Sequence, residues 1–166
     1  LDNHWMQHLE YRGGDLNLMF VRVDSDTVDN LVQKDEKRES VLSEKEQNEV
    51  KAIFEATVKN QPGASVTLSP LSPDDQPVLI TKPEFMRRMK EMQSMHGMGA
   101  LGDFPDSYNV VVNTNHPLVA QKLLRISDEA ERAGFSQYLV NLALLHQGML
   151  RGEALTGFVA ATLGKL

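Results

Sequence analysis

The sequence predicts an α+β fold: a small, mostly antiparallel three-stranded sheet with helices, ending in a two-helix hairpin. Short runs rich in β-branched and apolar residues are typical of strands, and they occur at 65–72 (SVTLSPLS), 78–81 (VLIT) and 107–114 (SYNVVVNT). Only PDDQP separates the first two runs, which favours a β-hairpin with a loose turn. The stretches around the strands repeat apolar residues at helical spacing.

Capping and turn signals place the helices that flank these strands. Ser43 and Glu46 match the capping-box pattern, so a helix should begin there. Its apolar positions recur at helical spacing: Val50, Ile53, Phe54, Thr57 and Val58. A second, short helix is expected over 115–125, because Pro117 suits a first helical turn.

The N-terminal part reads as a separate unit. Leu1, Trp5 and Leu9 follow a helical spacing that Gly13-Gly14 ends, and 16–23 (LNLMFVRV) is consistent with a buried strand followed by a helix over 26–32. The polar stretch 33–40 (QKDEKRES) reads as a linker. We therefore divide the chain into residues 1–40 and 41–166. The N-terminal ten residues lack a basic leader and an initiator Met, so we expect a piece of a longer protein.

Composition excludes several function classes. The formal net charge is −6, with Asp+Glu 23 against Lys+Arg 17, which disfavours binding to nucleic acid or to anionic membranes. There is no cysteine, so disulfides, thiolate zinc sites and a cysteine nucleophile are excluded. No apolar run approaches the roughly 20 residues that span a membrane. We expect a cytoplasmic protein.

Short motifs do not support catalysis. Gly97, Gly99 and Gly102 match the dinucleotide-binding string, but a helix precedes them where a strand is needed. Acidic residues at 24, 26 and 29 fail the calcium-loop pattern and favour helix capping. His4 and His8 could face one metal, although two ligands favour an ordinary helix face. We predict no enzymatic activity, no metal and no cofactor in this chain.

A stripe of methionines marks the helix expected after Pro83. Met86, Met89, Met92, Met95 and Met98 recur every third residue. Flexible, polarisable thioethers pack against many partners. A spacing of three drifts around a helix, so some of these side chains should face outward unless another chain covers them. Core packing and an exposed, adaptable surface both remain open.

The C-terminal helices predict an interface with a second copy of the chain. Over 135–166 the only charged side chains are Arg151, Glu153 and Lys165. Such a charge-poor pair would complete a helical bundle with its partner. The residues expected at or near this interface are Phe135, Leu139, Leu142, Leu145, Leu155, Phe158, Val159, Thr162 and Leu163.

In order along the chain, these segments resemble the bacterial heat-shock-ninety chaperone family. LDNHWMQHLE is similar to a helix late in the family's middle domain, and FVRVDSDTVDNLVQKDEK to the segment leaving it. The capping-box helix, PVLITK, PEFMRRMKEM and NVVVNTNHPLV follow the order of its C-terminal domain. The resemblance implies that 1–40 ends a middle domain and that 41–166 is a dimerisation domain forming a four-helix bundle in a homodimer.

The resemblance also implies how the region contributes to a chaperone. ATP and Mg would bind an N-terminal domain outside this chain, so the chain itself would hold no cofactor. Unfolded or partly folded clients would be the partners, and tetratricopeptide co-chaperones would not, because the chain ends in TLGKL. The implied client-contact residues are Phe85, Met86, Met89, Met92, Met95, His4, Trp5 and Gln7. The alternative is a regulatory or ligand-binding dimerisation module unrelated to chaperones.

Overall fold

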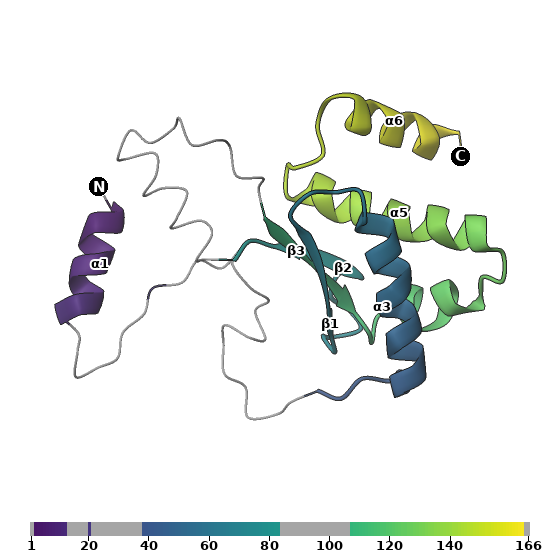
Figure 1. Cartoon of the computed structure of the whole chain (residues 1–166), viewed down its shortest axis with the longest axis horizontal. Helices are drawn as coiled ribbons and strands as arrows, with labels where there is room; N and C mark the ends of the chain where they lie inside the picture. Colours follow the sequence, from purple (N-terminus) through teal and green to yellow (C-terminus); the bar gives the residue numbers. More distant parts are fainter. Residues whose placement is uncertain (1, 13–19, 21–37, 84–106, 165–166) are drawn as a thin grey trace.

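The computed structural model describes residues 2–12, 20, 38–83 and 107–164, and its α+β class agrees with the sequence prediction (Figure 1). Predictions for the strand at 16–23, the helix at 26–32 and the methionine-rich helix lie outside these residues. The helices and strands are α1 (Asp2–Arg12), α3 (Glu44–Val58), β1 (Ala64–Ser69), β2 (Val78–Thr81), β3 (Tyr108–Asn113), the π-helix η1 (Leu118–Leu123), α5 (Glu129–His146) and α6 (Gly152–Leu163).

The sheet corrects the predicted pairing of its strands. Its order is β1-β3-β2, with β1 parallel and β2 antiparallel to β3, so the sheet is mixed and β1 and β2 do not form a hairpin. The most apolar strand, β3, takes the centre because Val110, Val111 and Val112 are all buried there. The link between β1 and β2 passes the end of β3 instead of turning tightly.

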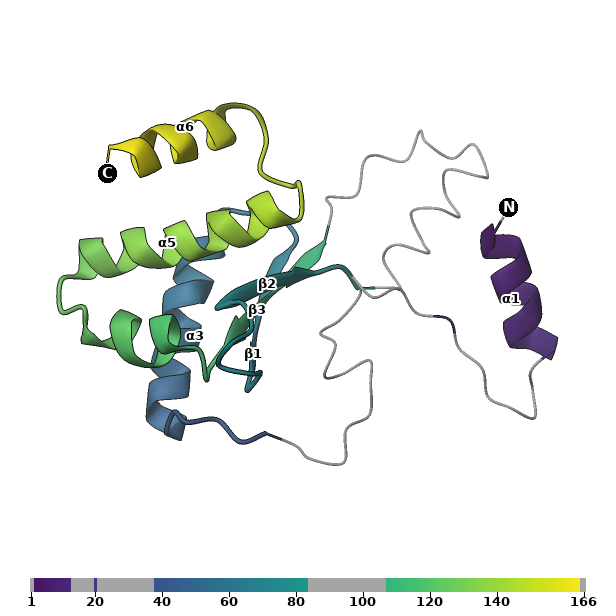
Figure 2. The same cartoon turned by 180° about the vertical axis from the view of Figure 1, so that it is seen from behind.

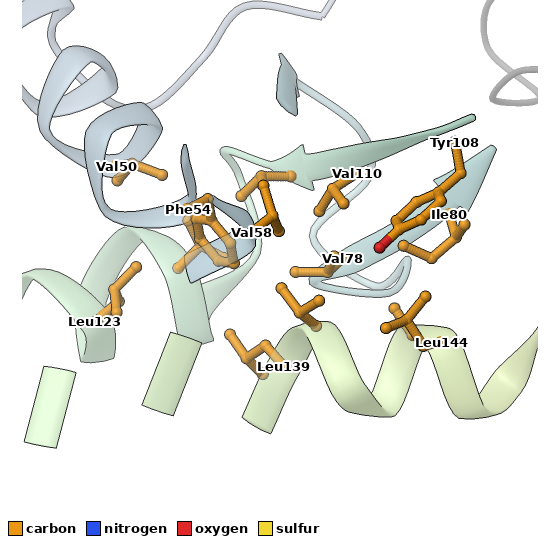
Figure 3. Close-up of a cluster of buried hydrophobic side chains, with 14 of the residues drawn as sticks. Val50, Phe54, Val58, Val78, Ile80, Tyr108, Val110, Leu123, Leu139 and Leu144 are labelled. Carbon is orange, nitrogen blue, oxygen red and sulfur yellow. The ribbon is translucent and has the colours of Figure 1, made fainter. Parts of the chain in front are cut away.

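Helices α3 and α5 pack on one face of this sheet (Figures 1 and 2). In the strand register, Val66, Val110 and Ile80 form one row across the sheet. Figure 3 shows Val50, Phe54 and Val58 of α3 meeting the strands and α5 in one apolar cluster. Each fully buried side chain of this size contributes about 1.5–3 kcal/mol relative to an exposed one, so this cluster dominates the stability of the fold.

The predicted capping box begins α3. The Ser43 backbone N–H donates to Glu46 Oε2 at 2.8 Å, and the Glu46 N–H donates to Ser43 Oγ at 3.4 Å. These bonds satisfy backbone donors that the first helical turn would leave free. The hydrogen bonds from the Ser43 side chain and backbone also lower the pKa of the Glu46 carboxyl. A local sequence signal therefore sets the position and direction of α3.

Two asparagines at the end of β3 organise the loops around the sheet. Asn113 is fully buried, and its Nδ2 donates to the Ser72 carbonyl at 2.7 Å while its Oδ1 accepts from the Asn115 N–H. Asn115 Oδ1 accepts from the Val41 N–H at 2.9 Å. Asn115 Nδ2 donates to the Glu39 and Leu71 carbonyls at 3.1 and 3.2 Å. The β1–β2 loop and the segment entering α3 are thus fastened to the end of β3.

The short helix expected over 115–125 forms, with π-helical geometry over its middle as η1. The His116 Nδ1 accepts the Leu118 N–H at 3.0 Å and starts the turn after Pro117. Val119 and Leu123 face the core. Desolvation lowers the pKa of His116, which favours the neutral ring that can accept this bond.

Figures 1 and 2 both show α1 standing apart from the sheet and its helices. The Phe20 N–H donates to Glu10 Oε1 at 2.7 Å, which links α1 to the segment that follows it. The division of the chain at residue 40 remains a prediction. Within the described ranges, no helix combines the length and apolar character that crossing a membrane requires.

We predict that only one of two neighbouring buried polar residues lowers stability when it is substituted. Asn113→Ala should lower the free energy of unfolding by about 1–3 kcal/mol, because the Ser72 carbonyl and the Asn115 N–H lose their partner. Thr114 is also buried, but its Oγ1 has no hydrogen-bond partner among the described residues. Thr114→Val should therefore leave stability equal or raise it. Urea unfolding followed by circular dichroism measures both, and equal losses would contradict the assignment.

Candidate interaction surface

Helix α5 has a core face and an exposed apolar face. Asp128 caps it by accepting the Glu131 N–H at 2.7 Å. The core face buries five residues against the sheet and α3: Ser136, Leu139, Val140, Ala143 and Leu144. Ser136 Oγ lies 2.8 Å from Thr57 Oγ1 and ties α5 to α3. On the other side, Leu142 is 42% and Leu145 39% exposed.

A glycine-dependent turn ends α5 and reverses the chain. Gly148 has a φ of 64°, the left-handed region that glycine adopts without strain. The Gly148 N–H donates to the Leu145 carbonyl at 2.9 Å and the Met149 N–H to the Leu144 carbonyl at 2.8 Å, a Schellman arrangement. Leu150 then enters the core, and Gly152, with a φ of 58°, begins α6. The turn therefore sets the antiparallel course of α6 over α5.

Helix α6 contributes no fully buried residue to the fold. It leans on the domain through three half-buried side chains, Leu155, Phe158 and Thr162, and the Phe158 ring lies 5.3 Å from the Tyr138 ring. Val159 is 45% and Leu163 64% exposed. Because helices of this length depend on tertiary burial, α6 gains less stability from the domain than α5, which buries five residues.

Two hollows flank α5. One of about 670 Å³ lies between α5 and α6, where small residues such as Gly134, Ala154, Gly157 and Ala161 leave space. The other, of about 350 Å³, lies between the C-terminal half of α5 and the start of β2. Gln76, Pro77 and Val78 form its sheet side. The lining of the second hollow is mostly apolar, and Gln76 and His146 are among its residues.

The start of α5 carries an ion pair, whereas the rest of α5 and α6 carries few charged side chains. Arg132, near the start of α5, pairs with Glu49 of α3 at 3.1 Å and donates through Nη2 to the Ile126 carbonyl at 2.6 Å. From Phe135 to Gly164 the charged side chains are Arg151 and Glu153. The exposed face of α5 and α6 is thus apolar and nearly uncharged, the character of a protein–protein interface.

The predicted interface residues fall into three groups. Leu142, Leu145, Val159 and Leu163 are exposed and lie on α5 and α6. Phe135, Leu155, Phe158 and Thr162 are half-buried. Leu139 is 2% exposed and packs in the domain's own core, and its place at or near an interface stays a prediction. Helical spacing alone does not separate the core face of α5 from its outer face, because both carry leucine.

The predicted client-contact residues are described only in part. Trp5 is 64% exposed on α1 and meets the His8 ring edge-on, with centroids 6.3 Å apart. The side chains of His4 and Gln7 lie outside what the structure describes. The same holds for Phe85, Met86, Met89, Met92 and Met95. Their client-binding role stays a prediction.

The described residues hold no side-chain cluster of the kind that binds a metal ion. Among them, no group of three His, Cys, Asp or Glu side chains lies close enough to hold an ion. Desolvation raises the pKa of the Tyr108 hydroxyl, which donates a hydrogen bond to Gln61 Oε1 and so acts as a packing residue. The geometry favours binding of another polypeptide through apolar contact.

Sequence reasoning missed the contribution of residues 76–78 to this surface. They precede and begin a short strand, and their sequence carries no interface signal. Only the packing of β2 beside α5 brings Pro77 and Val78 next to Leu142. The charge-poor sequence of 135–166 was the signal that predicted the part of this surface on α5 and α6.

Comparison with known proteins adds a family to this geometry. The chain is 39% identical over 129 residues to a chaperone protein HtpG of Porphyromonas gingivalis, which covers 76% of this chain and 19% of that protein. It is 38% identical over 117 residues to the HtpG proteins of Bacteroides fragilis and Bacteroides thetaiotaomicron, covering 69% of this chain and 17% of each. The chain thus spans about a fifth of the length of the curated relatives it matches. No family model matches the chain.

We predict opposite effects from alanine at two glycines of the terminal helix. Gly152→Ala should destabilise α6 by about 1–2 kcal/mol, because its positive φ disfavours any β-carbon although the added methyl group meets no atom within 4 Å. Gly157→Ala also meets no atom within 4 Å but lies inside the helix, so it should stabilise α6 by about 0.5–1 kcal/mol. Hydrogen exchange of the α6 amides measures both, and a shared direction would contradict this account.

Proposed function

Because the chain belongs to the HtpG family of heat-shock-ninety chaperones, we propose that residues 41–166 form a dimerisation domain and that residues 1–40 end the domain before it. The match supports a chaperone region. The regulatory or ligand-binding alternative has no comparable support among the matched proteins. The dimer, the clients and the use of ATP and Mg by the rest of such a protein belong to the proposal.

The exposed apolar face of α5 and α6 is the observation that carries the proposed dimer. Leu142, Val159 and Leu163 expose large apolar side chains, and α6 lacks a fully buried residue. A second copy packed on this face would complete a four-helix bundle and remove these side chains from water. Each square ångström of apolar surface buried contributes about 25 cal/mol, which favours association.

Dimerisation would serve a chaperone by holding together two arms, meaning the part of each chain that precedes the dimerisation domain. Linking two chains at one end raises the effective concentration of one arm near the other without any new contact between them. Clients would then meet apolar surfaces on both arms. Trp5 on α1, and the methionine-rich segment at 86–98, would supply weak contacts that demand no particular client sequence.

We predict that one charge in the α5–α6 face separates the dimer. Leu142→Glu and Val159→Glu should each weaken association about 100-fold, or about 2.7 kcal/mol, because a carboxylate would be buried at the interface. Light scattering across a dilution series measures the mass. Ala52→Glu, on the exposed side of α3, is the control and should keep the dimer. A well-folded parent chain that is monomeric at every concentration would overturn the proposed dimer.

We predict that client holding depends on Trp5 of α1 and on the methionine-rich segment at 86–98. Trp5→Ser should reduce the suppression of aggregation of a heat-denatured test protein at least twofold, because an exposed indole is a strong apolar anchor. Met89→Ser with Met92→Ser should do the same. Tyr11→Ser is the matched control, since Tyr11 is more exposed than Trp5 but points from another side of the helix. Unchanged holding in the Trp5 and methionine variants would count against client contact.

A further inference from the structure

The helix between β3 and α5 has a geometry that proteins adopt rarely. The residues after Pro117, Leu118–Leu123, form the π-helix η1. In a π-helix the backbone hydrogen bond reaches one residue further along the chain than in an α-helix, so each turn holds more residues. Such turns occur mostly as single insertions within α-helices, frequently at functional sites. The position of η1 therefore needs a physical cause.

The chain is held in place immediately before η1. The Asn115 side chain bonds the segment that enters the domain: its Oδ1 accepts the Val41 N–H at 2.9 Å, and its Nδ2 donates to the Glu39 carbonyl at 3.1 Å. The next residue, His116, starts the helical turn, because its Nδ1 accepts the Leu118 N–H at 3.0 Å. The start of η1 is thus joined through one asparagine to the entering segment.

The chain is also held shortly after η1. The Ile126 carbonyl accepts two hydrogen bonds from Arg132, one from Nε at 2.9 Å and one from Nη2 at 2.6 Å. Arg132 also pairs with Glu49 of α3 at 3.1 Å, which ties this end to the rest of the domain. Between the two ends, Val119 and Leu123 are buried, and Figure 3 shows Leu123 among the core side chains. Both ends and the inner side of η1 are therefore held.

Two held ends explain the π-helical geometry. A fixed number of residues must span the distance between Asn115 and Ile126, and a π-helical turn contains more residues than an α-helical turn. The segment η1 thus contains the residue that an α-helix between the same ends would leave over. When the Asn115 bonds break, the start of the helix is free to turn, so η1 can rewind as an α-helix. Rewinding shifts the residues on one side of η1 relative to those on the other.

We propose that Asn115 and η1 form an entry latch: displacement of the entering segment, residues 39–41, opens the Asn115 bonds and lets η1 rewind beside α5. The inference rests on the proposed division of the chain at residue 40, because the preceding domain supplies the displacement. Lys122 of η1 lies 4.8 Å above the Phe135 ring of α5, so a shift of η1 reaches the terminal helix pair. The latch has the two requirements of coupling, a continuous series of contacts and an element with two arrangements.

A matched pair of variants at one exposed residue tests the entry latch in the full chain. The Val41 side chain is 67% exposed and contributes little to packing, whereas its N–H bonds Asn115. Val41→Pro removes this N–H and should speed amide exchange in residues 117–125 about tenfold, the order expected for one lost hydrogen bond. Val41→Ala keeps the N–H and should leave that exchange unchanged. Hydrogen–deuterium exchange with peptide mass spectrometry measures both.

The amides of residues 50–58 in α3 are the reference within the same chain. Faster exchange in 117–125 with unchanged exchange in α3 would support transmission from the entering segment to η1. Equal exchange in the Val41→Pro and Val41→Ala chains would overturn the latch. Acceleration by the same factor in α3 and η1 would also overturn it, because that result reports a general loss of stability. Light scattering tests the proposed dimer separately, so failure of the latch leaves the dimer standing.

Deletion of one residue tests the part played by the π-helical geometry. Gln121 is exposed on η1, and its deletion removes the extra residue, so an α-helix should form between the same two ends. We expect this chain to fold, as checked by circular dichroism. In it, Val41→Pro should change the exchange of the same helix by less than about twofold, because η1 no longer has two arrangements. A change as large as in the parent chain would overturn the role of η1, and so would a deletion chain that fails to fold.

Discussion

The hydrogen bonds of Asn113 and Asn115 hold together segments that are distant in the sequence. From the end of β3 they reach the β1–β2 loop at Leu71 and Ser72 and the entering segment at Glu39 and Val41. These partners are backbone groups, so the bonds depend on where the backbone runs and not on which side chains those segments carry. The loop that crosses the end of β3 therefore has donors there for its Leu71 and Ser72 carbonyls. The Asn113 backbone N–H also donates to the Pro77 carbonyl at 3.0 Å, which holds the residue before β2 at the end of β3.

Helix α5 joins this framework to the proposed interface. Its core face packs on the sheet through Leu139 and Val140, while its outer face presents Leu142 and Leu145. The rigid side of α5 therefore positions the exposed side, and α6 extends that surface from a glycine turn. Since α6 buries no residue fully, its own stability is coupled to whatever covers it. Folding of the terminal helix and association of two chains are thus parts of one equilibrium in the proposed dimer.

Local signals predicted most elements well. The capping box at Ser43 begins α3, and the strand at 78–81 and the central strand of valines form where they were expected. The partners of those strands were wrong, because a short link between two strands favours a hairpin, yet β3 is inserted between them. Leu139, predicted at or near the interface, packs in the core of its own domain, because periodicity identifies apolar positions of a helix but not which neighbour covers each of them.

The sequence by itself determined the α+β class, the limits of most described helices and strands, the charge-poor character of the C-terminal pair and the resemblance to heat-shock-ninety chaperones. These depend on residues close together in the chain or on composition. Only the tertiary structure decided the mixed order β1-β3-β2, the burial of Leu139 and the hollow between α5 and residues 76–78. Each of these arises from contacts between residues tens of positions apart. Which of these contacts forms depends on the free energy of alternative pairings between distant segments. The spacing of residues within one segment does not predict that difference.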